Sequence, residues 1–232
     1  LFLQLPCLDN ESPGVRENPP MAGFYLLHSL RRSGNGSGRE VRFLSSEEET
    51  LDDRGLTELI GEWQPDLLCA TLYLWNVERT LHLLRKVRKC LPSIRFVVGG
   101  PEVSPRHPFL FQSLVPDVAV VGEGEWVFPR ILHALRTGTR ADLIHVAWKE
   151  GRRYGWGKTP LPPLGPESWL PAAEDLGWRP DAHGMAYLET SRGCPMRCSY
   201  CRYSHLGRGV TFLAPSEVLS RIRTLAERGA GE

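Results

Sequence analysis

Residues 66–100 read DLLCATLYLWNVERTLHLLRKVRKCLPSIRFVVGG, with two apolar runs on either side of an amphipathic stretch. The runs at residues 66–73 and 94–98 are nearly continuous, which is typical of strands covered on both faces of a parallel sheet. The stretch between them predicts a helix with one apolar stripe, marked by Val77, Leu81, Leu84 and Leu91. Together they predict a strand–helix–strand unit with a right-handed crossover.

The same alternation extends over residues 1–138. Further apolar runs predict strands at residues 1–6, 41–44 and 117–121. Further helical patterns lie at residues 21–32, 47–63 and 125–136. Pro19 and Pro20 precede the first of these helices, and Gly138 follows the last. This order predicts an α/β domain over residues 1–138 with a Rossmann-like, doubly wound parallel sheet.

The rest of the chain is expected to contain a linker and a second, truncated domain. Residues 139–184 are rich in proline and begin with a pattern that predicts a small hairpin over 143–149 and 154–156. Residues 185–232 predict a strand at 185–190 and a helix that follows Ser216 as its N-cap and ends at Gly229. One strand and one helix leave most of their apolar surface without a partner, so we expect residues 185–232 to be incomplete.

Composition and charge exclude several classes of protein. The 232 residues are 41% hydrophobic and 24% charged, as in ordinary globular proteins. No apolar run is long enough for a membrane helix, and the first residues lack the pattern of a secretion signal. The 28 basic and 27 acidic residues are interspersed, without the basic stripe of a nucleic-acid binder. We therefore expect a cytoplasmic protein that binds neither nucleic acid nor membrane.

Three of the six cysteines, Cys194, Cys198 and Cys201, follow a Cys-x3-Cys-x2-Cys spacing. This spacing matches one helical face, but Gly193 and Pro195 argue against a helix there. A structural zinc site needs a fourth ligand, which His205 could supply. The remaining interpretation is a [4Fe–4S] cluster held by three thiolates, which leaves one iron open.

The stretch YLETSRGCPMRCSYC at residues 187–201 resembles the opening of radical S-adenosylmethionine (SAM) enzymes. Their signature, Cys-x3-Cys-x-aromatic-Cys, follows the first strand of a (β/α) barrel, and Tyr200 fills its aromatic position. The resemblance implies that the three cysteines hold the [4Fe–4S] cluster and that Tyr200 lies at SAM. It also implies an external electron donor and cleavage of SAM to a 5′-deoxyadenosyl radical.

Ligands of parallel sheets bind at the carboxyl ends of the strands, and the loops expected there are unusual. They read TLYLWN at residues 71–76, GGPEVS at 99–104 and GEGE at 122–125. In this order they are similar to the cobalamin-binding domain that precedes many radical SAM barrels. The similarity implies cobalamin contacts from Leu5, Pro6, Thr71, Tyr73, Trp75, Asn76, Gly99, Gly100, Pro101, Gly122, Glu123 and Gly124.

The first loop departs from many cobalamin proteins, which place a histidine below cobalt. Residues 7–14 read CLDNESPG and contain no histidine. We therefore expect an apolar side chain, Leu74 or Trp75, to face the lower side of cobalt.

The family resemblance favours a cobalamin-dependent radical SAM methyltransferase with an unidentified small-molecule or peptide substrate. One alternative is a methylthiotransferase-like enzyme, in which Cys7, Cys69 and Cys90 would hold a second cluster. Cys69 and Cys90 lie inside predicted elements, however, where a buried structural role is expected. The other alternative is a non-catalytic cobalamin-binding or metal-binding fragment, because we expect this fragment alone to be inactive.

Overall fold

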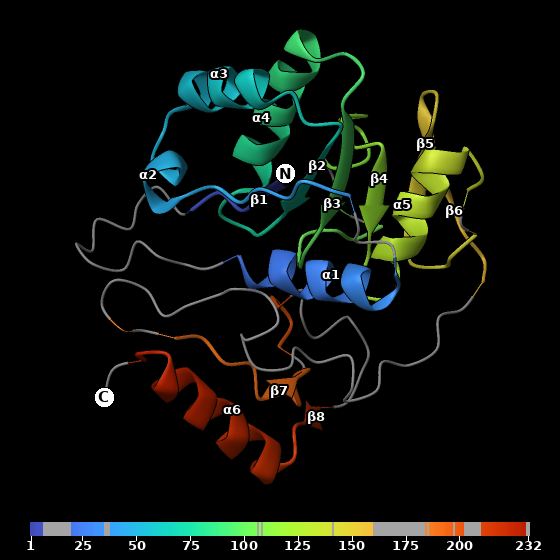
Figure 1. The fold of residues 1–232 in the computed structure, drawn as a ribbon. Coiled ribbons are helices and arrows are strands. Elements are labelled where there is room, and N and C mark those ends of the chain that lie inside the picture. Colours follow the sequence, from blue (N-terminus) through green and yellow to red (C-terminus); the bar gives the residue numbers. More distant parts are fainter. Residues whose placement is uncertain are drawn as a thin grey trace.

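A six-stranded sheet lies at the centre of the larger part of the molecule (Figure 1). The computed structural model describes residues 1–6, 20–34, 38–105, 107, 109–140, 142–159, 184, 186–196, 198–201 and 210–230. The sheet has the order β1-β2-β3-β4-β5-β6. Its strands are β1 (Phe2–Leu3), β2 (Leu67–Thr71), β3 (Arg95–Gly99), β4 (Val118–Val120), β5 (Val146–Glu150) and β6 (Arg153–Trp156). Strands β1 to β4 pair in parallel, as predicted. The predicted hairpin also forms, as β5 and β6, but it pairs antiparallel with β4 and extends the sheet beyond residue 138, contrary to its expected place in a linker.

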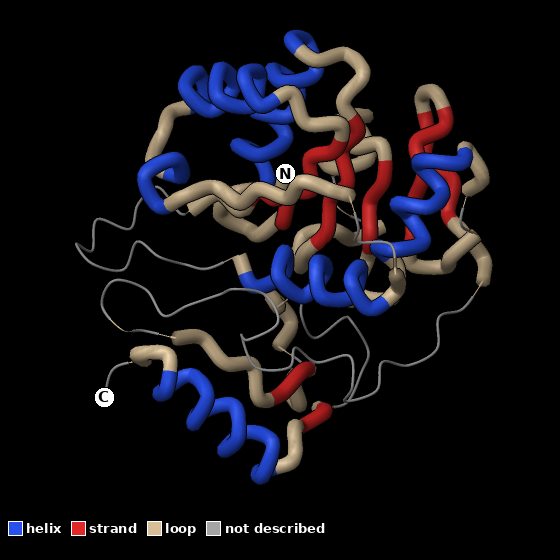
Figure 2. The backbone as a smooth tube through the Cα atoms, in the orientation of Figure 1, coloured by secondary structure: helices blue, strands red, loops and turns tan. Residues whose placement is uncertain are grey.

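Helices cover both faces of this sheet (Figure 2). On one face, α1 (Met21–Arg32) contacts α5 (Phe128–Thr137). On the other face, α3 (Asp53–Trp63) contacts α4 (Val77–Cys90), and the short helix α2 (Ser46–Glu49) precedes them. This is the doubly wound arrangement that the sequence predicts.

The strands are apolar throughout because each one supplies two cores. In β2, Leu68 and Ala70 join the core beneath α3 and α4, whereas Cys69 joins the core beneath α1 and α5. In β3, Phe96 and Val97 divide between the two cores in the same way. Period-two alternation is therefore present, but both faces are buried.

The order in which successive segments join the sheet reverses at β1. The segment at Phe43 forms an isolated parallel bridge with Phe2 along one edge of β1, whereas β2 pairs with its other edge. All later strands are added beyond β2. In open α/β sheets, such a reversal marks the crevice in which ligands bind.

Several element boundaries differ from the predictions. Residues 41–44 form only the bridge at Phe43 rather than a strand. The helix predicted at 47–63 is divided into α2 and α3, because Asp52 accepts a hydrogen bond from Gly55 N–H and starts a new helix. The helix predicted at 125–136 begins later, at Phe128, after a turn.

The C-terminal part has little regular structure besides one helix. No strand forms at 186–190 among the described residues, contrary to the prediction; instead β7 (Ser191–Arg192) pairs antiparallel with β8 (Thr211–Phe212). Helix α6 (Pro215–Glu227) has Ala214 as its N-cap rather than Ser216, because Pro215 occupies its first turn. Most of the predicted linker, residues 160–183, lies outside the described residues. No described helix has the length and apolar character needed to cross a membrane.

Candidate functional site

The buried side chain of Asn76 braces the crevice between β1 and β2. Its Nδ2 donates to the carbonyl oxygen of Leu5, two residues after β1, at 3.0 Å and to that of Thr71, the last residue of β2, at 3.2 Å. Its Oδ1 accepts from Tyr73 N–H at 2.8 Å. Asn76 is 1% exposed, so its amide is used within the chain, and its contact with a ligand stays a prediction.

The loop between β2 and α4 presents apolar side chains to solvent. Leu74 is 79% exposed and Trp75 is 52% exposed. The rings of Tyr73 and Trp75 stack with centroids 4.5 Å apart and planes 6° apart, which orders the exposed indole. Large apolar side chains exposed at a strand end indicate a surface that a ligand covers.

The glycine loop after β3 lies directly against the end of β2. Gly100 has φ +105°, and a Cβ there would lie 2.6 Å from the carbonyl oxygen of Leu72. Glu102 N–H donates to the same oxygen at 3.1 Å. Gly99 is also partly exposed, and a Cβ on it would meet no atom within 4 Å. The loop therefore needs glycine at 100 for its own fold, while Gly99 leaves open space for a ligand.

A buried carboxylate–imidazole pair supports this glycine loop, although no sequence motif pointed to it. His107 Nε2 lies 3.4 Å from Glu102 Oε2, and both side chains are buried. His107 Nδ1 accepts from the N–H of Leu110 at 3.2 Å, which leaves Nε2 as the nitrogen that donates to Glu102. The pair thus fixes Glu102, and with it the glycine loop, against His107.

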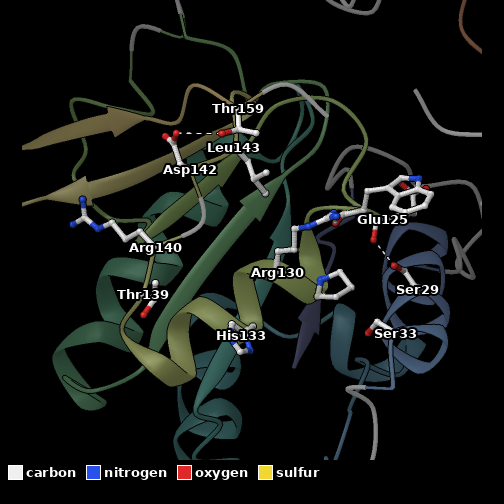
Figure 3. A pocket seen from close by; sticks show the side chains of 12 residues that line it. Ser29, Ser33, Glu125, Arg130, His133, Thr139, Arg140, Asp142, Leu143 and Thr159 are labelled. Atoms are coloured by element: carbon white, nitrogen blue, oxygen red, sulfur yellow. Dashed lines mark hydrogen bonds between the residues drawn. The ribbon is translucent and has the colours of Figure 1, made fainter. Parts of the chain in front are cut away.

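The third loop, after β4, is positioned by α1. Gly122 is exposed with φ +80°, and Gly124 lies against Leu26 of α1. Ser29 Oγ donates to the carbonyl oxygen of Glu125 (Figure 3). Of the other predicted contacts, Leu5 is 1% exposed, and Pro6, Thr71, Pro101 and Glu123 are partly exposed.

A cavity of about 640 Å³ lies beside α5 (Figure 3). Ser29 and Ser33 of α1 line one side, and Arg130 and His133 of α5 line another. Glu125 also lines it. None of the lining residues is among the predicted site residues.

The cysteine loop is accessible to solvent. Cys194, Cys198 and Cys201 are partly exposed, and Cys201 N–H donates to the carbonyl oxygen of Cys198 at 3.1 Å. Tyr200 is 87% exposed. Within the described residues, no three His, Cys, Asp or Glu side chains are arranged to hold one metal ion, so the three thiols are not gathered beforehand. Thiolates that converge only with their metal are common, because metal binding and local folding are coupled.

Arg192, two residues before Cys194, joins the cysteine loop to the loop after β4. Its Nη2 lies 2.7 Å from Glu125 Oε1 and 2.9 Å from Glu189 Oε2. Its guanidinium lies 4.8 Å from the ring centroid of Tyr25 in α1. No sequence motif pointed to this cluster, since Arg192 precedes the cysteine spacing and Tyr25 lies within a predicted helix.

The isolated cysteines lie apart from this loop. Cys69 is buried in β2, as predicted, and burial raises the pKa of its thiol to about 12. Cys90 ends α4 and is exposed, contrary to the expected buried role, whereas Val87 in the same last turn is buried in the core. Cys7 lies outside the described residues.

Comparison with known proteins identifies the family. The family model of the B12 binding domain matches residues 17–132. This chain belongs to the B12 binding domain family. The matched residues include the loops after β2, β3 and β4, so the B12 binding domain contains the sheet edge described above.

Curated relatives match this B12 binding domain and different shares of the rest of the chain. The hopanoid C-3 methylase of Methylococcus capsulatus is 29% identical over 224 residues, which cover 90% of this chain and 41% of the relative. TokK of Streptomyces tokunonensis, a cobalamin-dependent radical SAM methyltransferase, is 31% identical over 159 residues, covering 61% of this chain and 22% of TokK. The chain thus spans less than half the length of these curated relatives.

A solved structure shares the fold of this B12 binding domain and of the residues that follow it. The radical enzyme OxsB, solved with aqua-cobalamin and S-adenosylmethionine bound, matches with a TM-score of 0.63 at 16% identity. The match covers 98% of this chain and 31% of OxsB.

Proposed function

We propose that this chain is the cobalamin-binding and cluster-binding part of a cobalamin-dependent radical SAM methyltransferase. The observation that carries the proposal is that one chain combines a B12 binding domain with a Cys-x3-Cys-x2-Cys loop. Among the relatives, TokK is named a cobalamin-dependent radical SAM methyltransferase, and the hopanoid C-3 methylase matches 90% of this chain. When bound, cobalamin would carry the methyl group, and the cluster would supply the electron that cleaves SAM.

The exposed sheet edge fits a broad, flat corrin. Leu74 and Trp75 offer apolar surface, and Gly99 and Gly122 let the backbone approach closely. Asn76 and the Glu102–His107 pair hold the loops in place without using any ligand contact. In this proposal the residues of the edge bind and orient the corrin, and they exclude water from its lower face.

The lower side of cobalt would face an apolar side chain. The region after β1 contains no histidine up to residue 14, and Leu74 and Trp75 are the exposed apolar side chains beside the crevice. Without a nitrogen donor below it, cobalt would release a methyl group more readily.

The donor set of the cysteine loop fits an iron–sulfur cluster. Three thiols of partial exposure lie within one short loop, and thiolates are the ligands that such clusters take. Tyr200 is exposed beside the last cysteine and would lie at SAM. Such thiols must be reduced, so we place the protein in a reducing compartment, the cytoplasm. An external electron donor and a small-molecule or peptide substrate would complete the reaction.

Titration with hydroxocobalamin tests the corrin site. We expect the absorbance change to saturate at one cobalamin bound per chain. Electron paramagnetic resonance of the cob(II)alamin form should show no nitrogen splitting from a protein imidazole. Failure to bind would contradict the proposed function, and imidazole splitting would contradict the apolar lower side.

A further inference from the structure

The two proposed cofactor loops meet at one buried arginine. Arg192 is separated from Cys194 by a single residue, and Glu125 directly follows the Gly122–Gly124 stretch. The two residues are 67 positions apart in the sequence, yet Arg192 Nη2 and Glu125 Oε1 are 2.7 Å apart. The ion pair therefore connects the segment before the first cysteine to the loop at the end of β4.

The guanidinium of Arg192 is held on several sides. Its Nε and Nη2 donate to the two carboxylate oxygens of Glu189 at 3.0 and 2.9 Å, a bidentate geometry that fixes its plane. Glu123 adds a longer contact of 3.9 Å to Nη1. One side chain thus contacts carboxylates from both the loop after β4 and the segment before the cysteines.

Helix α1 closes the cluster. The ring of Tyr25 lies against the guanidinium, and Ser29 donates to the carbonyl oxygen of Glu125 (Figure 3). Burial raises the pKa of Tyr25, and the charge of Glu189 with its hydrogen bond to the phenol raises it further. Tyr25 therefore stays a neutral donor to Glu189.

Burial makes this arrangement sensitive to the loss of its cation. The side chains of Arg192 and Glu125 are 11% and 10% exposed. Burial alone would lower the pKa of Arg192, but Glu125 and Glu189 outweigh it, so the guanidinium keeps its charge. Removing the arginine would leave the nearly buried carboxylate of Glu125 close to those of Glu189 and Glu123 without their shared cation, which is unfavourable.

We propose that Arg192 is a positioning residue that fixes the cysteine loop against the loop after β4. The cluster and cobalamin would thereby be held at a fixed position relative to each other. The functional part of this inference rests on the proposed function. The mechanical part does not, because it concerns contacts within the chain alone.

Hydrogen–deuterium exchange on the metal-free, reduced chain tests the mechanical part. In Arg192→Gln, we expect at least tenfold faster exchange both in residues 122–128 and in residues 186–196. Phe128 N–H, bonded to Gly124 O, reports on the first segment. Leu213 N–H lies outside the second segment but is bonded to Thr190 O within it, so its exchange should rise as well. Arg192→Lys keeps the charge but loses the bidentate fork, so its exchange should fall between wild type and Arg192→Gln.

Arg88→Gln is the matched control. Arg88 pairs with Asp117 at the opposite end of β4 with a distance of 2.6 Å, and its guanidinium lies 4.3 Å from the ring centroid of Phe96. We expect it to lower overall stability without speeding exchange in either peptide selectively. The proposal is overturned if Arg192→Gln leaves residues 122–128 unchanged, or if Arg88→Gln loosens both peptides equally.

Adding hydroxocobalamin tests the functional part. In wild type, cobalamin should slow exchange in residues 122–128 and also in residues 186–196. In Arg192→Gln, only residues 122–128 should be protected. Protection of both peptides in the variant would contradict the proposal that Arg192 couples the positions of the two loops. If no variant binds cobalamin, the proposed function fails, whereas the metal-free comparison still decides whether Arg192 joins the two loops.

Discussion

Residues 1–159 and residues 186–230 are held together in different ways. The largest fully buried side chains, among them Phe96, Leu110 and Ile131, all belong to the first region. In the second region, Leu213 and Leu225 are the buried apolar side chains among the described residues. Several others there are exposed by 37% or more: Tyr187, Met196, Tyr200, Phe212, Leu219 and Ile222.

The comparison shows that the sheet region is stabilised by its own two cores, whereas the cysteine-bearing region is attached mainly through polar contacts. Arg192 provides the best-defined of these contacts. Apolar burial supplies most of the free energy of folding in domains of this size. The sheet region is therefore expected to fold and bind cobalamin independently of what the cysteine loop holds.

Loss of the cluster without loss of cobalamin would sharpen this comparison most. Cys198→Ala removes one thiolate of three, and we expect the iron-dependent absorbance of the reconstituted chain to fall to background. Cobalamin binding should be unchanged, because Cys198 does not belong to the sheet region. Cys90→Ala, at the exposed end of α4, is the control and should retain both. Joint loss in Cys198→Ala would show that the two regions are not separable.

Truncation of one isoleucine in each region measures the difference in packing. Ile131 of α5 is 0% exposed, and Ile131→Ala should lower the free energy of unfolding by about 3–4 kcal/mol. Ile222 of α6 is 49% exposed, and Ile222→Ala should change it by less than about 0.5 kcal/mol. Urea denaturation gives both values. Equal effects would contradict the division into a packed and a weakly packed region.

Two neighbouring glycines separate folding from binding at the sheet edge. In Gly100→Ala, the new Cβ would lie 2.6 Å from Leu72 O at a φ of +105°, so we expect a loss of about 2–3 kcal/mol in stability. Gly99→Ala meets no atom within 4 Å and should leave stability unchanged, but weaken cobalamin binding about tenfold. Denaturation and cobalamin titration test both. Normal stability in Gly100→Ala would show that this loop adapts.

The last and smallest predicted change in stability concerns Glu49, a buried carboxylate in α2. Burial raises the pKa of Glu49 from 4.5 to about 7, so the folded state holds its proton more tightly than the unfolded state. Its contribution to stability is thus present below about pH 4.5 and is lost as the pH rises through 7. Glu49→Gln should stabilise the chain by about 1 kcal/mol at pH 8 and not at pH 4, measured by thermal denaturation.

Glu47→Gln is the control for this pH effect, because Glu47 is an exposed neighbour on the same helix. It should give no gain at either pH. A gain at pH 8 in both variants would point to the net charge of the helix instead of burial.

The alternation of apolar runs and amphipathic stretches predicted the layers of the sheet region. It could do so because buried positions in strands and helices carry apolar residues at regular spacing. Val77, Leu81 and Leu84 are buried on the predicted face of α4. The start of α2 also had a local signal, since Ser45 and Glu48 form a capping box. Boundaries failed where a single cap, such as Asp52, outweighed the apolar stripe.

The Arg192 cluster could not be predicted in this way. Its partners Tyr25, Glu125 and Glu189 come from three separate segments, and only the folded chain brings them together. The strand predicted at 185–190 failed for a related reason: an extended segment becomes a strand only where another strand pairs with it. Among the described residues, the neighbouring strand pairs instead with Ser191 and Arg192.

The central claim is that one chain carries a corrin site and a separate three-thiolate cluster site. Anaerobic reconstitution with iron, sulfide and hydroxocobalamin, followed by metal analysis, tests it most directly. We predict one cobalt and the iron of a single [4Fe–4S] cluster per chain, with no zinc. Zinc at the cysteines, a second cluster, or iron without cobalt would contradict the account.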